Sequence, residues 1–117
     1  MKLPTTQGIP VDGESLCEYM QMLVGSFFKI IPIGESDDKS SLQTYLQSFQ
    51  LELMGCQGLV LELKHEPLFI SLISILQYFI DHPDISLVVL RRETFKAISI
   101  CTKLKARYTT IAVGEEG

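Results

Sequence analysis

The fold is decided by two short apolar stretches, FKIIPI at residues 28–33 and ISLVVL at residues 85–90. Both contain a high proportion of β-branched residues, which favour extended strands. Two similar runs, at residues 59–63 and 110–113, alternate with longer stretches that have helical spacing. Because strands that alternate with helices need crossover connections, this order predicts an α/β fold with a four-stranded, mostly parallel sheet and three crossover helices.

The helices are indicated by apolar residues that recur every three to four positions. Capping boxes begin the first two, with Ser15 paired to Glu18 and Ser40 paired to Gln43, and Pro67 suits the first turn of the third. The first helix precedes the strands and is therefore an extra N-terminal helix. The expected helices cover residues 15–26, 40–55, 67–81 and 92–107.

Proline and glycine are frequent in residues 1–13, so this segment is expected to be an irregular N-terminal arm. The remainder, residues 14–117, has the length of a single α/β domain and contains no linker or internal repeat. An all-α bundle is the alternative, because periodicity alone does not distinguish a short buried strand from a buried helical segment. The β-branched residues in 30–33 and 85–90 favour the α/β fold.

The composition indicates a cytoplasmic domain with a large apolar core. Apolar residues make up 46% of the chain, yet the longest nearly unbroken apolar run, residues 67–80, is shorter than the roughly 20 residues that span a bilayer. The N-terminus has no apolar run that would serve as a signal peptide. The three cysteines, Cys17, Cys56 and Cys101, lie far apart in apolar contexts and are expected to be reduced thiols.

Charge is divided unevenly along the chain. Residues 1–85 carry four basic and eleven acidic residues, whereas residues 86–117 carry six basic and three acidic ones. Four bases of the last helix form a basic docking face for an acidic protein surface or a nucleic-acid backbone, or else a solvated helix face. Aromatic residues are not interleaved with them, which argues against binding of single strands. These bases are Arg92, Lys96, Lys103 and Arg107.

Polar residues follow three of the predicted strands. Ligands bind outside the carboxyl ends of strands in an open parallel sheet, so these loops are the candidate ligand or partner site. The functional interpretation is an anion or partner site, and the alternative is that the loops are polar because they are solvated. The residues are Asp37 and Asp38 after the first strand, Lys64 and His65 after the second, and Arg91 after the third.

The sequence predicts no metal, no cofactor and no catalytic set. His65 and His82 lie at opposite ends of the same expected helix, and neither has a cysteine or histidine at ligand spacing. Cys56, beside a glycine, is the most exposed candidate nucleophile, but the sequence connects no histidine to it. None of the loops has the glycine-rich form that binds phosphate.

From Phe28 onward, the order of predicted elements resembles the STAS domain, the fold of anti-sigma-factor antagonists. Residues 59–63, Leu-Val-Leu-Glu-Leu, are similar to a characteristic strand of that family. This run leads through Phe69, Ile70 and Ser71 into the next helix. The resemblance implies that Ser71 occupies the position of the family's phosphoacceptor serine, and that the protein acts by binding other proteins.

These observations together predict a non-enzymatic cytosolic regulatory or protein-interaction module of STAS-like type. The alternatives are a small-ligand or phosphate-binding α/β enzyme that uses Lys64, His65 and Arg91, and a nucleic-acid-binding protein that uses the last helix. A homodimer is also expected. Helix 67–81 is apolar around most of its circumference, so it should be covered by helix 15–26, by its copy across a two-fold axis, or by both.

Overall fold

The structure of the chain, a computed structural model, describes residues 9–36 and 38–116, with the backbone alone described at residues 39 and 111–116. These residues form α-helices, one short 3₁₀ helix and connecting loops, and no strand. The predicted four-stranded α/β fold is therefore wrong, and the all-α alternative is correct. The elements are α1 (Gly13–Phe28), α2 (Ile30–Glu35), α3 (Lys39–Leu59), η2 (Leu61–Leu63), α4 (Pro67–Asp81) and α5 (Leu87–Glu116).

The first predicted strand, residues 28–33, is the end of α1 followed by α2. Lys29 joins the two helices with helical backbone angles (φ −65°, ψ −21°). Ile30 is fully buried in the core, so tertiary packing overrides its preference for strands. Pro32 lies in the first turn of α2, where its missing N–H would have had no acceptor within the helix.

The other predicted strands are also parts of helices or loops. Residues 85 and 86 precede α5 and residues 87–90 form its first turn, where the Ser86 hydroxyl accepts a hydrogen bond from the Val89 N–H at 3.3 Å, as in an N-cap. Residues 59–63 are the last residue of α3 and the turn of η2, with one isolated parallel bridge between Ile9 and Val60. Residues 110–113 lie inside α5. The STAS-like order of elements is therefore absent, and this removes the basis of the resemblance.

Three of the described helices, α1, α3 and α4, begin at a side-chain cap. Asp12 accepts a hydrogen bond from the Ser15 N–H at 2.7 Å and begins α1, and Asp38 does the same for Ser41 at 3.0 Å and begins α3. These aspartates, rather than the predicted capping boxes, are the N-caps. The predicted helix 67–81 is confirmed residue for residue by α4, which starts at Pro67 after the capping carboxylate of Glu66.

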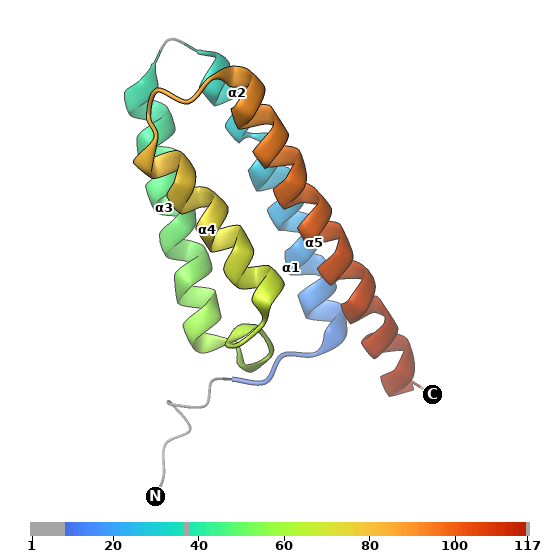
Figure 1. Cartoon of the computed structure of the whole chain (residues 1–117). Coiled ribbons are helices and arrows are strands. Elements are labelled where there is room, and N and C mark those ends of the chain that lie inside the picture. The colour runs from blue at the N-terminus through green and yellow to red at the C-terminus, as the bar shows by residue number, and fades with distance from the viewer. Residues whose placement is uncertain (1–8, 37, 117) are drawn as a thin grey trace, which may run out of the picture.

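The helices form two antiparallel pairs (Figure 1). α1 and α5 lie side by side along most of α1, and α3 and α4 form a hairpin that packs against them. α2 lies at the end of the bundle where α5 begins, and it is tied to α5 by an ion pair between Glu35 and Arg91. Gly34 of α2 allows close packing there, because a Cβ atom at this position would force the buried side chain of Leu90 to move.

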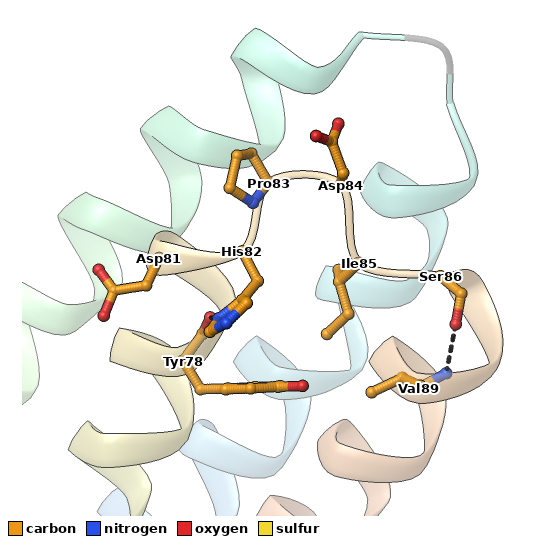
Figure 2. Close-up of a pocket in the computed structure, with 8 residues that line it drawn as sticks. All are labelled: Tyr78, Asp81, His82, Pro83, Asp84, Ile85, Ser86 and Val89. Atoms are coloured by element: carbon orange, nitrogen blue, oxygen red, sulfur yellow. Dashed lines mark hydrogen bonds between the residues drawn. The ribbon is translucent and has the colours of Figure 1, made fainter.

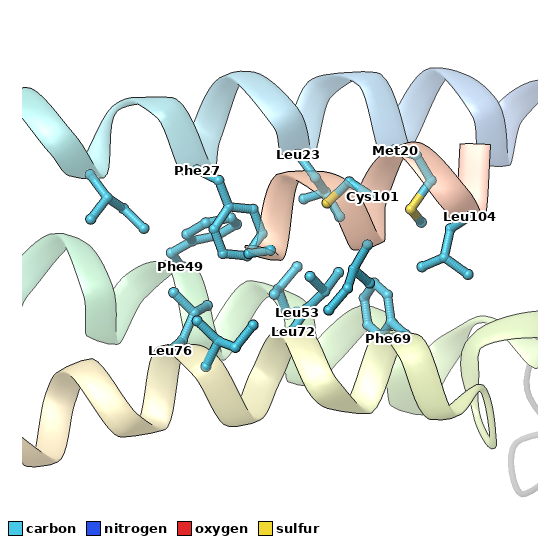
Figure 3. Packing of buried hydrophobic residues seen from close by; sticks show 14 of the residues in the cluster. Met20, Leu23, Phe27, Phe49, Leu53, Phe69, Leu72, Leu76, Cys101 and Leu104 are labelled. Carbon is cyan, nitrogen blue, oxygen red and sulfur yellow. The ribbon is translucent and has the colours of Figure 1, made fainter. Parts of the chain in front are cut away.

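The core runs along the middle of the bundle and takes residues from every long helix (Figure 3). Phe27 of α1 packs against Phe49 of α3, with ring centroids 4.8 Å apart and the ring planes tilted by 60°. The inward-facing residues of α4 are buried in this core: Phe69, Leu72, Ile75, Leu76 and Phe79. The apolar surface of helix 67–81 is therefore covered mostly within the same chain.

Among the residues that the structure describes, the helical stretch Gly13–Glu35 has the length and the apolar composition needed to cross a membrane. Core helices of globular proteins and signal sequences pass the same test. In the structure, α1 places one side in the core through Leu16, Met20, Leu23 and Phe27, while Met22 on another side is 68% exposed.

Candidate functional site

The predicted strand-end site is not formed. Lys64 and His65 lie in the loop before α4, whereas Arg91 lies in the first turns of α5, at the other end of α4 (Figure 1). α4 has 15 residues, so these groups are separated by roughly 20 Å. Asp38 is occupied as the N-cap of α3, and Asp37 lies outside the described residues. The prediction was wrong because it depended on a sheet edge that the fold does not contain.

The basic docking face lies along one side of α5, but acidic residues neutralise much of it. Arg92 and Lys96 both contact Glu93, at 3.2 and 3.9 Å. Arg107 forms an ion pair with Glu66, the residue that caps α4. These pairs offset part of the charge of three of the four bases, which remain exposed, so the stripe is a weaker attractant for nucleic acid than its sequence implied.

The fourth base, Lys103, is exposed and has no partner among the residues that the structure describes. It is therefore the member of the predicted stripe whose charge no acidic side chain of the described residues offsets.

Ser71 lies inside α4 rather than in an exposed turn. Its hydroxyl donates a hydrogen bond to the carbonyl oxygen of Pro67 at 3.1 Å, and the residue is half-buried. This is the usual contact of a serine within a helix. The phosphoacceptor role followed from the STAS resemblance, so it no longer has support.

A shallow hollow of about 430 Å³ lies where the loop between α4 and α5 folds back (Figure 2). The rings of Tyr78 and His82 lie 4.5 Å apart, and His82 Nδ1 lies 2.8 Å from the Tyr78 carbonyl oxygen. Asp81 accepts a hydrogen bond from the Gln77 amide at 2.9 Å. These contacts join neighbouring residues of one helix end, so the groups serve to close the helix rather than to face a shared ligand.

The three cysteines are free and lie in different environments. The Cys17 thiol donates to the carbonyl oxygen of Lys105 at 3.3 Å, and Cys56 Sγ accepts a hydrogen bond from the Tyr19 hydroxyl at 3.1 Å. Cys101 is fully buried, and burial raises the pKa of its thiol to about 12. Among the described residues, no group of His, Cys, Asp or Glu side chains could hold a metal ion.

Because a thiolate is the reacting species, we expect iodoacetamide to modify Cys101 at least about tenfold more slowly than Cys17 or Cys56 in the native protein. Mass spectrometry of peptides after timed alkylation measures the three rates. In denaturant, where burial is lost, the three cysteines should react at similar rates. Equal rates in the native protein would contradict the buried position of Cys101.

Sequence reasoning missed an uncharged surface on the outer side of α1 and α5. Phe28 and Phe95 meet there edge to face, with ring centroids 5.8 Å apart, and they are 45% and 49% exposed. A Cβ atom on Gly25 would meet nothing within 4 Å, so the backbone of α1 is accessible beside Phe28. We call this surface the uncharged face and define it by Gly25, Phe28, Val88, Phe95, Ser99, Thr102 and Ala106, all of them exposed.

The spacing of these residues keeps them on one side of α5. Val88, Phe95 and Thr102 are seven residues apart, and Ser99 and Ala106 continue the same side four residues further along. This seven-residue spacing was visible in the sequence. The sequence does not show that Phe28 and Val88 share a surface, because the β-branched residues around them predict two separate strands.

No family model, no curated protein and no solved structure matches this chain.

Proposed function

We propose that the chain is a non-enzymatic, cytoplasmic interaction module that binds another protein through the uncharged face. The observation that carries this proposal is the exposed Phe28–Phe95 pair. Aromatic side chains held in one geometry on the surface are typical anchors of protein interfaces, because they bury a large area at little entropic cost.

The surroundings of the pair support the proposal. Ser99, Thr102 and Ala106 continue the face along α5 with short side chains, so another helix could approach closely. Val88 adds a third exposed apolar side chain, 74% accessible, at the other end. Apolar groups flanked by small uncharged ones resemble the core of an interface more than the ordinary charged surface of a helix.

Site-specific photo-crosslinking tests this proposal in the cells that produce the protein. A photoreactive phenylalanine derivative at Ser99 should give one discrete adduct, which an excess of unmodified chain removes by competition. The same derivative at Gln47, an exposed residue of α3, should give none. Phe95→Ser in the competing chain should abolish its ability to compete. Absence of a discrete adduct at Ser99, or equal adducts at both positions, would contradict the proposal.

A further inference from the structure

The uncharged face is bordered by opposite charges on its two long edges. Glu14 and Glu18 are exposed on the outer side of α1, and Lys103 is exposed on the far side of α5. None of these three side chains has a partner among the residues that the structure describes. At the level of Glu18 and Lys103 the face therefore carries a negative edge, an uncharged centre and a positive edge, whereas the other end of α1 carries the exposed Lys29.

The two unpaired edges lie at the same level of the bundle. Cys17 Sγ contacts the carbonyl oxygen of Lys105 at 3.3 Å and the Thr109 hydroxyl at 3.0 Å, which fixes the register of the antiparallel helices. Glu18 follows Cys17, so it lies near the level of Ala106. Lys103 is three residues from Ala106, or about 4.5 Å along the helix axis, which a lysine side chain can reach.

We infer that the uncharged face binds a second copy of this chain across a two-fold axis that runs parallel to α1 and α5. This inference rests on the proposed docking function of the face and names its partner. Rotation about such an axis places the negative edge of one copy against the positive edge of the other at the same level. Glu18 then faces Lys103 of the partner subunit, and this pairing occurs twice in the dimer.

The other two-fold arrangement in the plane of the face uses the charges less well. An axis perpendicular to the helices, at the level of the Phe28–Phe95 pair, would carry Glu18 and Lys103 of the two copies to opposite ends of the contact. Neither edge would then meet an opposite charge, so the parallel axis is favoured. The parallel axis also stacks Phe28 and Phe95 near the centre of the contact, where anchors contribute most.

A membrane surface is the less favoured occupant. Anionic lipids would attract Lys103 but repel Glu14 and Glu18 on the opposite edge of the same face. A second copy satisfies both edges at once, whereas a uniformly charged surface satisfies only one.

Sedimentation equilibrium of the full chain, over a concentration series that reaches the high micromolar range, tests the inference. The chain should dimerise, and Phe95→Ser should prevent this. Glu18→Lys and Lys103→Glu should each weaken the dimer by roughly tenfold, because each reverses two edge contacts. The double variant should restore dimerisation to near the original strength. Asp81→Lys, an exposed reversal on α4, is the matched control and should have no effect.

Each outcome decides between the inference and the proposal on which it rests. A monomer at every concentration would overturn the dimer, and a competed adduct at Ser99 would then still support docking of a different protein. If the chain dimerises but the double variant does not recover dimerisation, the two-fold axis parallel to α1 and α5 would be overturned. A monomer that floats with vesicles of mixed anionic and zwitterionic lipid, and loses this when Phe95 is replaced by serine, would assign the face to membranes and overturn both.

Discussion

Replacing Leu63 by alanine is expected to lower the free energy of unfolding by about 2–5 kcal/mol. Leu63 ends the 3₁₀ turn after α3 and is fully buried in the core. Its truncation removes buried methyl groups and leaves a cavity, because the helix ends around it cannot close completely. Domains of this size are stable by only about 5–15 kcal/mol, so the loss would be a large part of the total.

Leu59→Ala is the matched control, with the same chemistry four residues earlier. Leu59 is 63% exposed, so we expect a change within about 0.5 kcal/mol. Urea unfolding followed by circular dichroism, at one fixed protein concentration, measures both variants. In a strand, residues 59, 61 and 63 would share one face and be buried together. Similar losses for Leu59→Ala and Leu63→Ala would therefore restore the predicted strand and contradict η2.

The sequence predicted the helices best where the signals were local. α4 has the predicted bounds because Pro67 suits a first turn and His82-Pro83 stops a helix, and both are effects of adjacent residues. α3 was predicted to end at Gly55 but continues to Leu59. A glycine such as Gly55 lowers helix stability by only about 1 kcal/mol relative to alanine. Burial of Leu53 on the opposite side of α3 offsets this cost, so the helix continues past Gly55.

The predicted strands are wrong because the preference of β-branched residues for strands is weaker than the packing they gain in this bundle. Ile30 is a strand former by preference, but it is fully buried in the bundle at the start of α2. The stabilisation that a residue gains from core contacts in a helix can outweigh its intrinsic preference for strands, because that preference spans only about 1 kcal/mol. Ser86 was the local signal for the start of α5 that the strand assignment obscured.

The candidate site was harder to predict than the fold. Phe28 and Phe95 come from helices far apart in the sequence, and they meet only because α1 and α5 pack antiparallel. The basic stripe is visible in the sequence, and so is Glu93 beside Arg92, but the partner of Arg107 is not. That partner, Glu66, is close to Arg107 in space and distant in sequence. Pairing of this kind depends on tertiary structure.

Replacing Met20 by lysine is expected to lower the free energy of unfolding by about 3–5 kcal/mol, a large part of the total stability of a domain of this size. Met20 is fully buried in α1, and Figure 3 shows it in the core beside Leu104. A lysine there would place an ammonium group among apolar side chains with no carboxylate partner in that cluster. Thermal unfolding followed by circular dichroism measures the effect.

Met22→Lys separates the bundle from a membrane-spanning helix. Met22 is 68% exposed, so the bundle should tolerate this charge with a change within about 0.5 kcal/mol. If Gly13–Glu35 crossed a bilayer instead, a lysine at either position would meet hydrocarbon and cost roughly 2.5–3.5 kcal/mol of insertion free energy. The bundle therefore predicts opposite outcomes for two methionines that are two residues apart. It also predicts that the protein with lysine at position 22 stays folded and remains outside the membrane fraction after cell lysis. Equal loss of both variants from the folded, soluble pool would mean that α1 meets lipid on the side that carries Met22.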